Sequence, residues 1–460
     1  MSAIADDDGE AVKPAGGLFG HPRGLVVLAG TELWERISFH GMQALLTLYM
    51  VGQLFTPGHV EKIIGFAGLR SAIQALTGPL STQALASQVF GLYVGLVAFM
   101  PVIGGWLGDR WLGRKGAVTI GALLMTAGHF CMAFDQSFLL AMLFLIIGAG
   151  ALRGNLAPQV GELYPQHDAR RDTAFQLYYS MVNLGAFIAP VVTGALAQTF
   201  SWHIGFGFAG VGMSVGLIIY LSGQRWVVPV IVRETKAAKT PLTAAERRRV
   251  LILLALVPVS ALFWIGQSQI WNTYNLWVRD HIQLHIGSFQ VPVPWLQAID
   301  GLSPFICLPP MLMMWRWQAS RGREPSPFAK AGIGCLIFAC STLWLAAAGF
   351  VTDEAGRSPL IWAIVFHLAS NLGWLYFTPT MVAIFTRSAP ASIVATLLGV
   401  NSASAFLGSI ISGRLGGLYE ALTPAQFWTL HASLVGLGAA IFLLIDWRFG
   451  KAYGVVGTSA

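Results

Sequence analysis

The chain has 460 residues, of which 55% are hydrophobic and 11% are charged, and its mean hydropathy is +0.64. A soluble protein carries about 25% charged residues, so the composition excludes an ordinary soluble domain and predicts a polytopic, all-α membrane protein. The net charge of +7 does not indicate nucleic-acid binding, because the basic residues are spread through short connections between apolar segments. The four cysteines lie in apolar segments and lack metal-ligand spacing.

Twelve apolar segments are long enough to cross a bilayer as helices. The connection at 223–249 is the longest one predicted on the cytoplasmic side, and it divides the segments into two groups of six. We therefore predict a tail at 1–23, a six-helix bundle at 24–222, this linker, a second bundle at 250–448 and a tail at 449–460. Two such bundles around a central site describe the major facilitator fold. The twelve segments are 24–51, 82–107, 116–134, 138–160, 174–199, 204–222, 250–278, 293–315, 328–350, 359–386, 392–418 and 426–446.

The basic residues predict the orientation in the membrane. Most of the 28 Lys and Arg residues fall in connections on the same side as the N-terminus, which favours a cytoplasmic location for both termini. Few are predicted on the opposite side or inside helices. The residues on the opposite side are Lys62, Arg70, Arg279 and Arg357, and those inside helices are Arg36, Arg153 and Arg414.

The first apolar segment carries three charges, Glu32, Glu35 and Arg36. Charges within a membrane helix are costly, and they mark ion or substrate pathways unless they are paired for structure. The spacings i,i+3 and i,i+4 place all three on one helix face. Two carboxyl groups beside a fixed cation can exchange a proton. The alternative is a self-neutralised ion pair that only holds helices together.

The second and third segments are joined by GGWLGDRWLGRKG at 104–116. Its glycines allow two helices to approach closely, and Asp109, Arg110 and Arg114 can form charge pairs at the cytoplasmic mouth. This loop resembles the signature loop of the major facilitator superfamily, which implies a gating role for these three residues. The alternative is a basic loop that only sets the topology.

Three further motifs narrow the resemblance to the proton-dependent oligopeptide transporter family. The sequence ELWERISFHG from Glu32 resembles the ExxER motif of that family, and GAGALRGN at 148–155 resembles its GxGxxKPN motif. The sequence FQLYYSMVNLGAF from Phe175, which contains Asn183, resembles its fifth-helix signature.

The resemblance implies a proton-coupled symporter of short peptides that works by alternating access, is driven by the proton gradient and needs no other cofactor. It assigns proton handling to Glu32 and Glu35. It assigns the substrate carboxylate and salt-bridge switching to Arg36, and it makes Asn183 a cavity residue. Movement of Arg36 between a carboxylate and the substrate would couple proton release to transport.

The first half of the chain departs from the family pattern at two places. The family lysine of the fourth helix is Arg153, which keeps its charge at working pH and prefers bidentate contacts with oxyanions. The aromatic pair of the first helix is Phe39 and His40. His40 either titrates near neutral pH or packs as a neutral ring.

The second half departs further, and it lacks the two additional helices that many bacterial members carry between the bundles. Gln267 and Ser268 stand where the family often has acidic residues, and Asp300 stands where an asparagine is common. Trp374 replaces the glutamate that receives the amino terminus of a peptide. Asp300 is therefore a candidate both for proton coupling and for the ligand. Trp264 and Trp374 either stack on a ligand or pack between helices.

These changes keep two cations and remove acidic positions, so we expect a carboxylate-bearing or otherwise anionic ligand. The leading function is a proton symporter of short peptides or peptide-like carboxylates in a bacterial inner membrane, working as a monomer. The alternatives are transport of another anionic or organic metabolite, in either direction, and a transporter-like receptor without a complete proton cycle. An enzyme is not expected, because the chain contains no GxxxxGK[ST], no HExxH and no Cys/His ligand set.

Overall fold

The structure is a computed structural model that describes residues 17, 20–165, 167–227 and 242–454. Most of the predicted N-terminal tail and the middle of the linker lie outside the described residues. The described part is almost entirely helical, which confirms the predicted all-α class. The long helices of the first half are α1 (Arg23–Tyr49), α3 (Thr82–Leu107), α4 (Gly113–Cys131), α5 (Phe138–Glu162), α6 (Arg170–Thr199) and α7 (Trp202–Gly223). Those of the second half are α8 (Ala244–Gln269), α10 (Pro294–Ser320), α11 (Pro327–Ala348), α12 (Ile361–Ser388), α13 (Val394–Gly416) and α14 (Pro424–Gly454).

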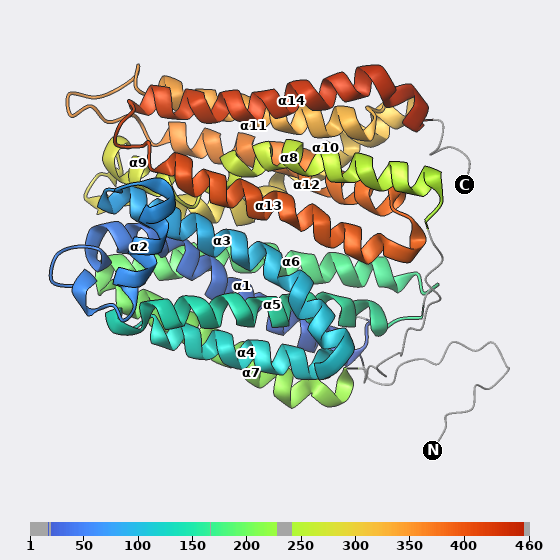
Figure 1. Ribbon diagram of the computed structural model, residues 1–460, viewed down its shortest axis with the longest axis horizontal. Coiled ribbons are helices and arrows are strands. Elements are labelled where there is room, and N and C mark those ends of the chain that lie inside the picture. Colours follow the sequence, from blue (N-terminus) through green and yellow to red (C-terminus); the bar gives the residue numbers. More distant parts are fainter. Residues whose placement is uncertain (1–16, 18–19, 166, 228–241, 455–460) are drawn as a thin grey trace.

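Shorter elements connect these helices, mostly at one end of the molecule. That end carries the helices α2 (Phe66–Thr77) and α9 (Thr273–His281) and a two-stranded hairpin, β1 (His285–Ile286) and β2 (Phe289–Gln290). We call it the hairpin end. The opposite end, where α1 begins and α14 ends, is the termini end (Figure 1). The remaining short elements are η1 (Met50–Leu54), η2 (Val60–Lys62), η3 (Gly108–Leu112), η4 (Asp135–Ser137), η5 (Gln224–Trp226) and η6 (Ala391–Ile393).

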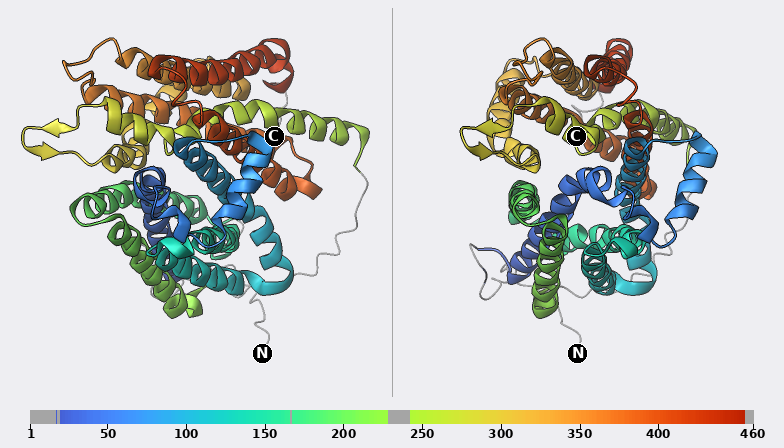
Figure 2. Two further views of the ribbon diagram at one scale, coloured as in Figure 1. Left: turned by 60° about the vertical axis from the view of Figure 1, so that its left-hand side comes forward. Right: turned by 90° about the vertical axis from the view of Figure 1, so that its left-hand side faces the viewer.

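The helices form two bundles, one from each half of the chain (Figures 1 and 2). The N-terminal bundle contains α1 and α3–α7, and the C-terminal bundle contains α8 and α10–α14. The bundles meet where α3 packs on α13 and α6 packs on α10. The helix α1 of the N-terminal bundle also contacts α9 and α10.

Ten helical segments in the described part of the chain are long and apolar enough to cross a membrane. One of these segments covers both α3 and α4, although the chain turns between them at Gly113, where φ is +65°. The helix α1 is not among the ten, because its charged and polar side chains lower its hydropathy. The number of membrane crossings therefore stays a prediction.

The prediction of one continuous helix at 250–278 was wrong. The helix α8 ends at Gln269, and α9 begins at Thr273 after a break at which Asn272 has φ −107° and ψ −109°. Side chains take up the backbone groups that the break releases, since Gln297 Nε2 donates to the carbonyl of Ile270 at 2.6 Å. The polar residues at 267–275 permit this break inside an apolar segment.

Two boundaries of the predicted bundles also differ from the helices. The helix α8 begins six residues inside the predicted linker, because Thr243 and Glu246 form a capping box. The helix α14 continues into the predicted C-terminal tail and ends at Gly454.

The hydrogen bonds that join the two bundles lie toward the hairpin end. Asn272 Nδ2 donates to Ser87 Oγ at 2.7 Å, and Gln83 Nε2 donates to the carbonyl of Gly416 at 3.0 Å. Thr47 Oγ1 donates to Asn272 Oδ1 at 3.4 Å. These contacts come from α1 and α3 on one side and from the α8–α9 break and α13 on the other. They close the interface between the bundles at the hairpin end.

Close helix packing in the N-terminal bundle depends on glycine at one position in particular. A Cβ at Gly104 of α3 would lie 2.0 Å from the carbonyl oxygen of Gly150 on α5, whereas a Cβ at Gly207 of α7 would meet nothing within 4 Å. We expect Gly104→Ala to lower stability by about 1–3 kcal/mol, because neither backbone can yield without moving a helix. Gly207→Ala is the matched control and should leave the apparent melting temperature in detergent unchanged or raise it. Equal melting temperatures for the two variants would contradict this packing.

Candidate functional site

The three charges of α1 form one buried network. Arg36 Nε donates to Glu32 Oε1 at 2.7 Å and lies 2.8 Å from Glu35 Oε2. Tyr178 of α6 donates its hydroxyl to Glu32 Oε2 at 2.5 Å. The side chain of Glu35 is fully buried, and that of Arg36 is 15% exposed. A single guanidinium therefore bridges both carboxylates.

Arg153 of α5 is the second cation of this network. Its Nε donates to Glu35 Oε1 at 2.9 Å, and its guanidinium carbon lies 3.9 Å from the centre of the Phe39 ring. Arg36 is 6.0 Å from the same ring. The two arginines thus approach Glu35 from two helices, with Phe39 packed beside them. The network carries two positive and two negative formal charges.

The backbone around the network explains how these helices come together. A Cβ at Gly185 of α6 would lie 2.6 Å from Arg36 Cβ and 2.9 Å from the carbonyl oxygen of Leu33. Because Gly185 has no side chain, α6 can lie directly against the charged face of α1. This contact brings Tyr178, two helical turns earlier on α6, to Glu32.

Two further predicted ligand residues, His40 and Asn183, lie on α1 and α6. His40 packs against Phe39 and against Trp271 at the α8–α9 break, with ring centres 5.1 Å and 5.2 Å apart. Asn183 donates to the carbonyl of Tyr179 at 3.1 Å, so its amide is engaged within α6.

Asp300 does not join the α1 network. It lies on α10 in the C-terminal bundle, where its Oδ1 is 2.7 Å from His367 Nδ1 and accepts a hydrogen bond from Asn371 Nδ2 at 2.5 Å. Both partners belong to α12. The structure thus separates Asp300, which had been grouped with Glu32, Glu35 and Arg36, into a second polar cluster.

The remaining predicted ligand residues of the C-terminal bundle are mostly engaged in packing. Ser268 is 2.8 Å from Ser409 on α13, hydroxyl to hydroxyl, and Trp264 packs where Gly408 of α13 leaves room for it. Trp374 is half-buried against an apolar cluster that includes Met311. Gln267 Oε1 is buried and has no hydrogen-bond partner among the described residues.

The predicted gate lies at the termini end. Arg114 Nε donates to Asp109 Oδ1 at 3.0 Å, and Arg114 also pairs with Glu162 at the end of α5. Arg110 is exposed and lies beside the ring of Trp106. Nearby, hydrogen bonds from the side chain and backbone of Arg170 lower the pKa of Asp168 to about 2, which keeps this surface pair charged near neutral pH.

Tyr178, His129 and His367 were not among the predicted site residues, although the structure places them in or beside the two polar clusters. Asn183 was the predicted cavity residue of α6, yet Tyr178 is the residue that bonds to Glu32. His129 of α4 is fully buried near Glu35 and Arg153, and neither of its ring nitrogens has a hydrogen-bond partner in the described part of the chain. A histidine inside an apolar segment is a weak signal, because its partners come from other helices.

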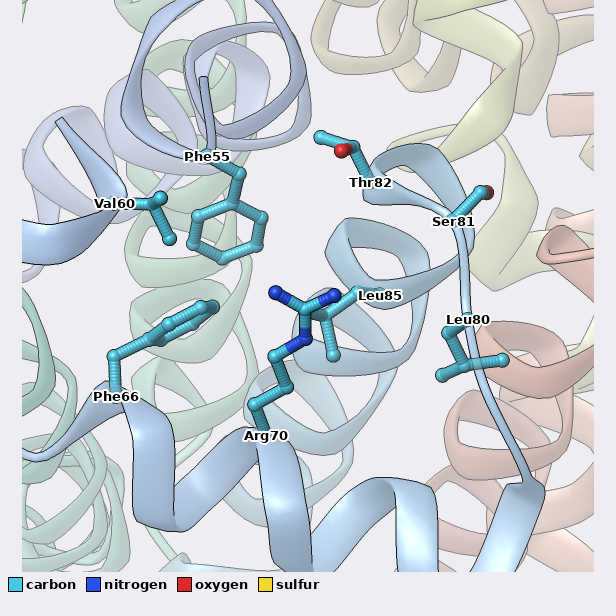
Figure 3. A pocket seen from close by; sticks show the side chains of 8 residues that line it. All are labelled: Phe55, Val60, Phe66, Arg70, Leu80, Ser81, Thr82 and Leu85. Carbon is cyan, nitrogen blue, oxygen red and sulfur yellow. The ribbon is translucent and has the colours of Figure 1, made fainter. Parts of the chain in front are cut away.

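A small cavity at the hairpin end lies outside this site. It is lined by residues of the segment 55–85, and the guanidinium of Arg70 points into it between Phe55 and Leu85 (Figure 3). It contains none of the predicted site residues.

Comparison with known proteins places the chain among transporters. The sequence profile described as the POT family matches residues 115–240 and 227–429. The chain is 29% identical to the peptide transporter YePEPT of Yersinia enterocolitica, over 93% of this chain and 94% of that protein. It is 28% identical to the transporter YclF of Bacillus subtilis, over 96% of this chain and 98% of that protein. A crystal structure of a peptide transporter POT in complex with sulfate matches with a TM-score of 0.81 and 27% identity, over 95% of this chain and 97% of that one. These matches confirm the predicted fold class.

Proposed function

The chain belongs to the POT family of membrane transporters and is not an enzyme, and from this premise we propose that it is a proton-coupled symporter of short peptides or peptide-like carboxylates. Its proposed location is the inner membrane of a bacterium. We propose that it works as a monomer, with the proton gradient as its only energy source. The termini end would face the cytoplasm, in keeping with the distribution of Lys and Arg.

The observation that carries this proposal is the position of Arg36 between two carboxylates. Its Nε lies 2.7 Å from Glu32 and 2.8 Å from Glu35. When either glutamate binds a proton, Arg36 loses an opposite charge and becomes available to the carboxylate of a substrate. When the substrate leaves, Arg36 returns and the proton is released. Each step exchanges one carboxylate partner of the guanidinium for another, so proton and substrate movement are linked.

The closed hairpin end fits one half of an alternating-access cycle. The contacts of Asn272 and Gln83 hold the bundles together there. In the proposed orientation this is the external side. The structure would then correspond to a state in which exchange with the outside is blocked.

A second candidate function is transport of an anion that has no ammonium group. Among the described residues, Asp300 is the only carboxylate on the helices α10–α13, and its Oδ1 is already bound by His367 and Asn371. Trp374 offers no negative charge. The network on α1 and α5, by contrast, offers two arginines. This asymmetry favours ligands recognised mainly by their carboxylate.

The test is uptake into proteoliposomes with an inside-alkaline pH gradient, using alanylalanine and its N-acetylated form. The N-acetylated peptide keeps the carboxylate but cannot carry an ammonium charge. We expect both compounds to bind and at least one to be accumulated with entry of protons. Accumulation of both would favour recognition through the carboxylate alone.

Binding of either compound without proton entry would instead support the receptor alternative. If neither compound changes the apparent melting temperature, although a bound ligand stabilises the state it binds, the peptide-like substrate class is wrong. A parallel screen of small organic anions then tests the second candidate function. Liposomes without protein give the background leak in each case.

A further inference from the structure

The cluster around Asp300 has the features of a functional site in its own right. The side chain of His367 is fully buried and that of Asp300 is 10% exposed. Three buried polar atoms of the cluster have no hydrogen-bond partner among the described residues: Asp300 Oδ2, His367 Nε2 and the hydroxyl of Tyr274. Unsatisfied buried polar groups are costly. One such carboxylate oxygen with two such neighbouring groups indicates that the cluster gains a ligand in another state.

The chemistry of the cluster fits a proton as that ligand. With a neutral His367 donating from Nδ1 to Asp300, the pair carries one negative charge within the membrane. One added proton on Asp300 Oδ2 removes that net charge. Imidazole is the side chain that ordinarily exchanges protons near neutral pH. Asn371 donates to Asp300 Oδ1 both before and after protonation.

Among the described residues, Asp300 and His367 form no ion pair with any other charged side chain. The helix α9 contributes Tyr274, whose ring meets His367 edge-on at 5.1 Å. At Gly301, the nearest atoms of α6 are backbone atoms of Asn183, Ala186 and Phe187. On α14, Trp428 packs on Tyr274 and separates it from His431, whose imidazole is bound to Gln269 and to the carbonyl of Phe427.

A chain of hydrogen bonds connects the helix of Asp300 to the closed hairpin end. Gln297 lies three residues before Asp300 on α10, and its Nε2 donates to the carbonyl of Ile270 and to Asn275 Oδ1. Asn275 in turn donates to the carbonyl of Ala44 on α1 at 3.4 Å. The position of α10 relative to α12 therefore affects the break between α8 and α9, which forms part of the closure.

We propose that Asp300 and His367 form a second proton-binding site, and that its protonation loosens the closure at the hairpin end. In the deprotonated state, charge-assisted hydrogen bonds hold α10 against α12. Protonation of Asp300 Oδ2 converts them to weaker neutral bonds, so that α10, Gln297 and the α8–α9 break can move away from α1. This site adds to the α1 network and does not depend on it.

The test measures opening of the hairpin end by the distance between two spin labels, as pH is lowered from about 8 to about 5. The labels replace Gln136 and Glu354, which are exposed on opposite bundles, in a variant whose four cysteines are substituted. We expect a longer-distance population that grows as pH falls. Asp300→Asn should show this population at every pH and lose the pH response. His367→Gln should shift the midpoint of the transition.

Two further variants make the result decisive. Ser370→Ala is the matched control, because Ser370 is buried on α12 but bonds only to the carbonyl of His367, and it should keep the wild-type midpoint. Glu35→Gln should also keep the response. A response that survives Asp300→Asn and disappears in Glu35→Gln would overturn this proposal while leaving the α1 network intact. If Asp300→Asn does not fold, an unchanged midpoint in His367→Gln contradicts the proposal.

Discussion

Replacing Glu35 with glutamine is expected to abolish accumulation driven by a pH gradient while leaving exchange of substrate across the membrane. Glutamine keeps the size and the hydrogen-bonding oxygen of the side chain but cannot bind and release a proton. Glu35 is fully buried between Arg36 and Arg153, so no solvent-exposed group can substitute for it. With one proton per neutral substrate, a gradient of about 1 pH unit supports up to about tenfold accumulation. The variant should reach a ratio of about one.

The measurement pairs gradient-driven uptake with counterflow in the same proteoliposomes. Glu35→Asp retains an ionisable group and should restore accumulation at a lower rate. Glu61→Gln is a control at an exposed carboxylate of the hairpin end and should behave as the wild type. If Glu35→Gln still accumulates substrate tenfold, proton coupling does not depend on Glu35. Loss of both uptake and counterflow would instead assign Glu35 to substrate binding or to stability.

The α1 network was predictable from the sequence because its members are close along the chain. Glu32, Glu35 and Arg36 lie on one helical face by spacing alone, and the structure brings them together with Arg153, which the family resemblance had marked. The contact of Tyr178 with Glu32 could not be predicted from the sequence. Which residue of α6 meets α1 is decided by the close approach at Gly185, which depends on the packing of two helices and not on the pattern within one.

The C-terminal bundle shows the opposite case. Asp300 was visible as a charge in an apolar segment, but its pairing with His367 depends on how α10 packs on α12. The break after Gln269 was missed for a similar reason. Hydropathy alone favours a continuous helix there, and the break is stabilised by side chains from α3 and α10, Ser87 and Gln297, which lie far away in the sequence. Both features depend on contacts between helices that are far apart in the sequence, and for this reason they could not be predicted from it.

The Asp300 cluster and the α1 network lie at different positions along their helices, which suggests that they exchange protons with different sides of the membrane. Asp300 lies six residues from the start of α10, about 9 Å from its hairpin end by the rise of an α-helix. Glu32 lies nine residues from the start of α1, which begins at the termini end. A proton-binding site toward each side would allow one cluster to respond to the external pH and the other to release its proton toward the cytoplasm. The external pH should therefore act on the Asp300 cluster, and the cytoplasmic pH should act on the α1 network.

Arg153 provides the second large expected effect. Replacing it with methionine removes the cation that bonds to Glu35 Oε1 and packs on Phe39. Breaking one side of a buried ion pair costs about 3–5 kcal/mol, because it leaves a buried charge with too little compensation. We therefore expect a clear fall in the apparent melting temperature in detergent at neutral pH. Affinity for a carboxylate ligand should fall by about tenfold to a hundredfold, since a hydrogen bond to a charged group contributes about 1.5–3 kcal/mol.

A double substitution separates the two effects of Arg153. In Arg153→Met combined with Glu35→Gln, no carboxylate is left without its partner, so most of the lost stability should return. The affinity for the ligand should not return, because the cation is still missing. Arg153→Lys restores the residue expected from the family and should keep the stability of the protein. It should bind the carboxylate ligand less tightly, because an ammonium cannot make the bidentate contact that a guanidinium makes with a carboxylate. Additive losses of stability in the double variant would show that Arg153 and Glu35 act independently, and Arg153 would then belong to helix packing.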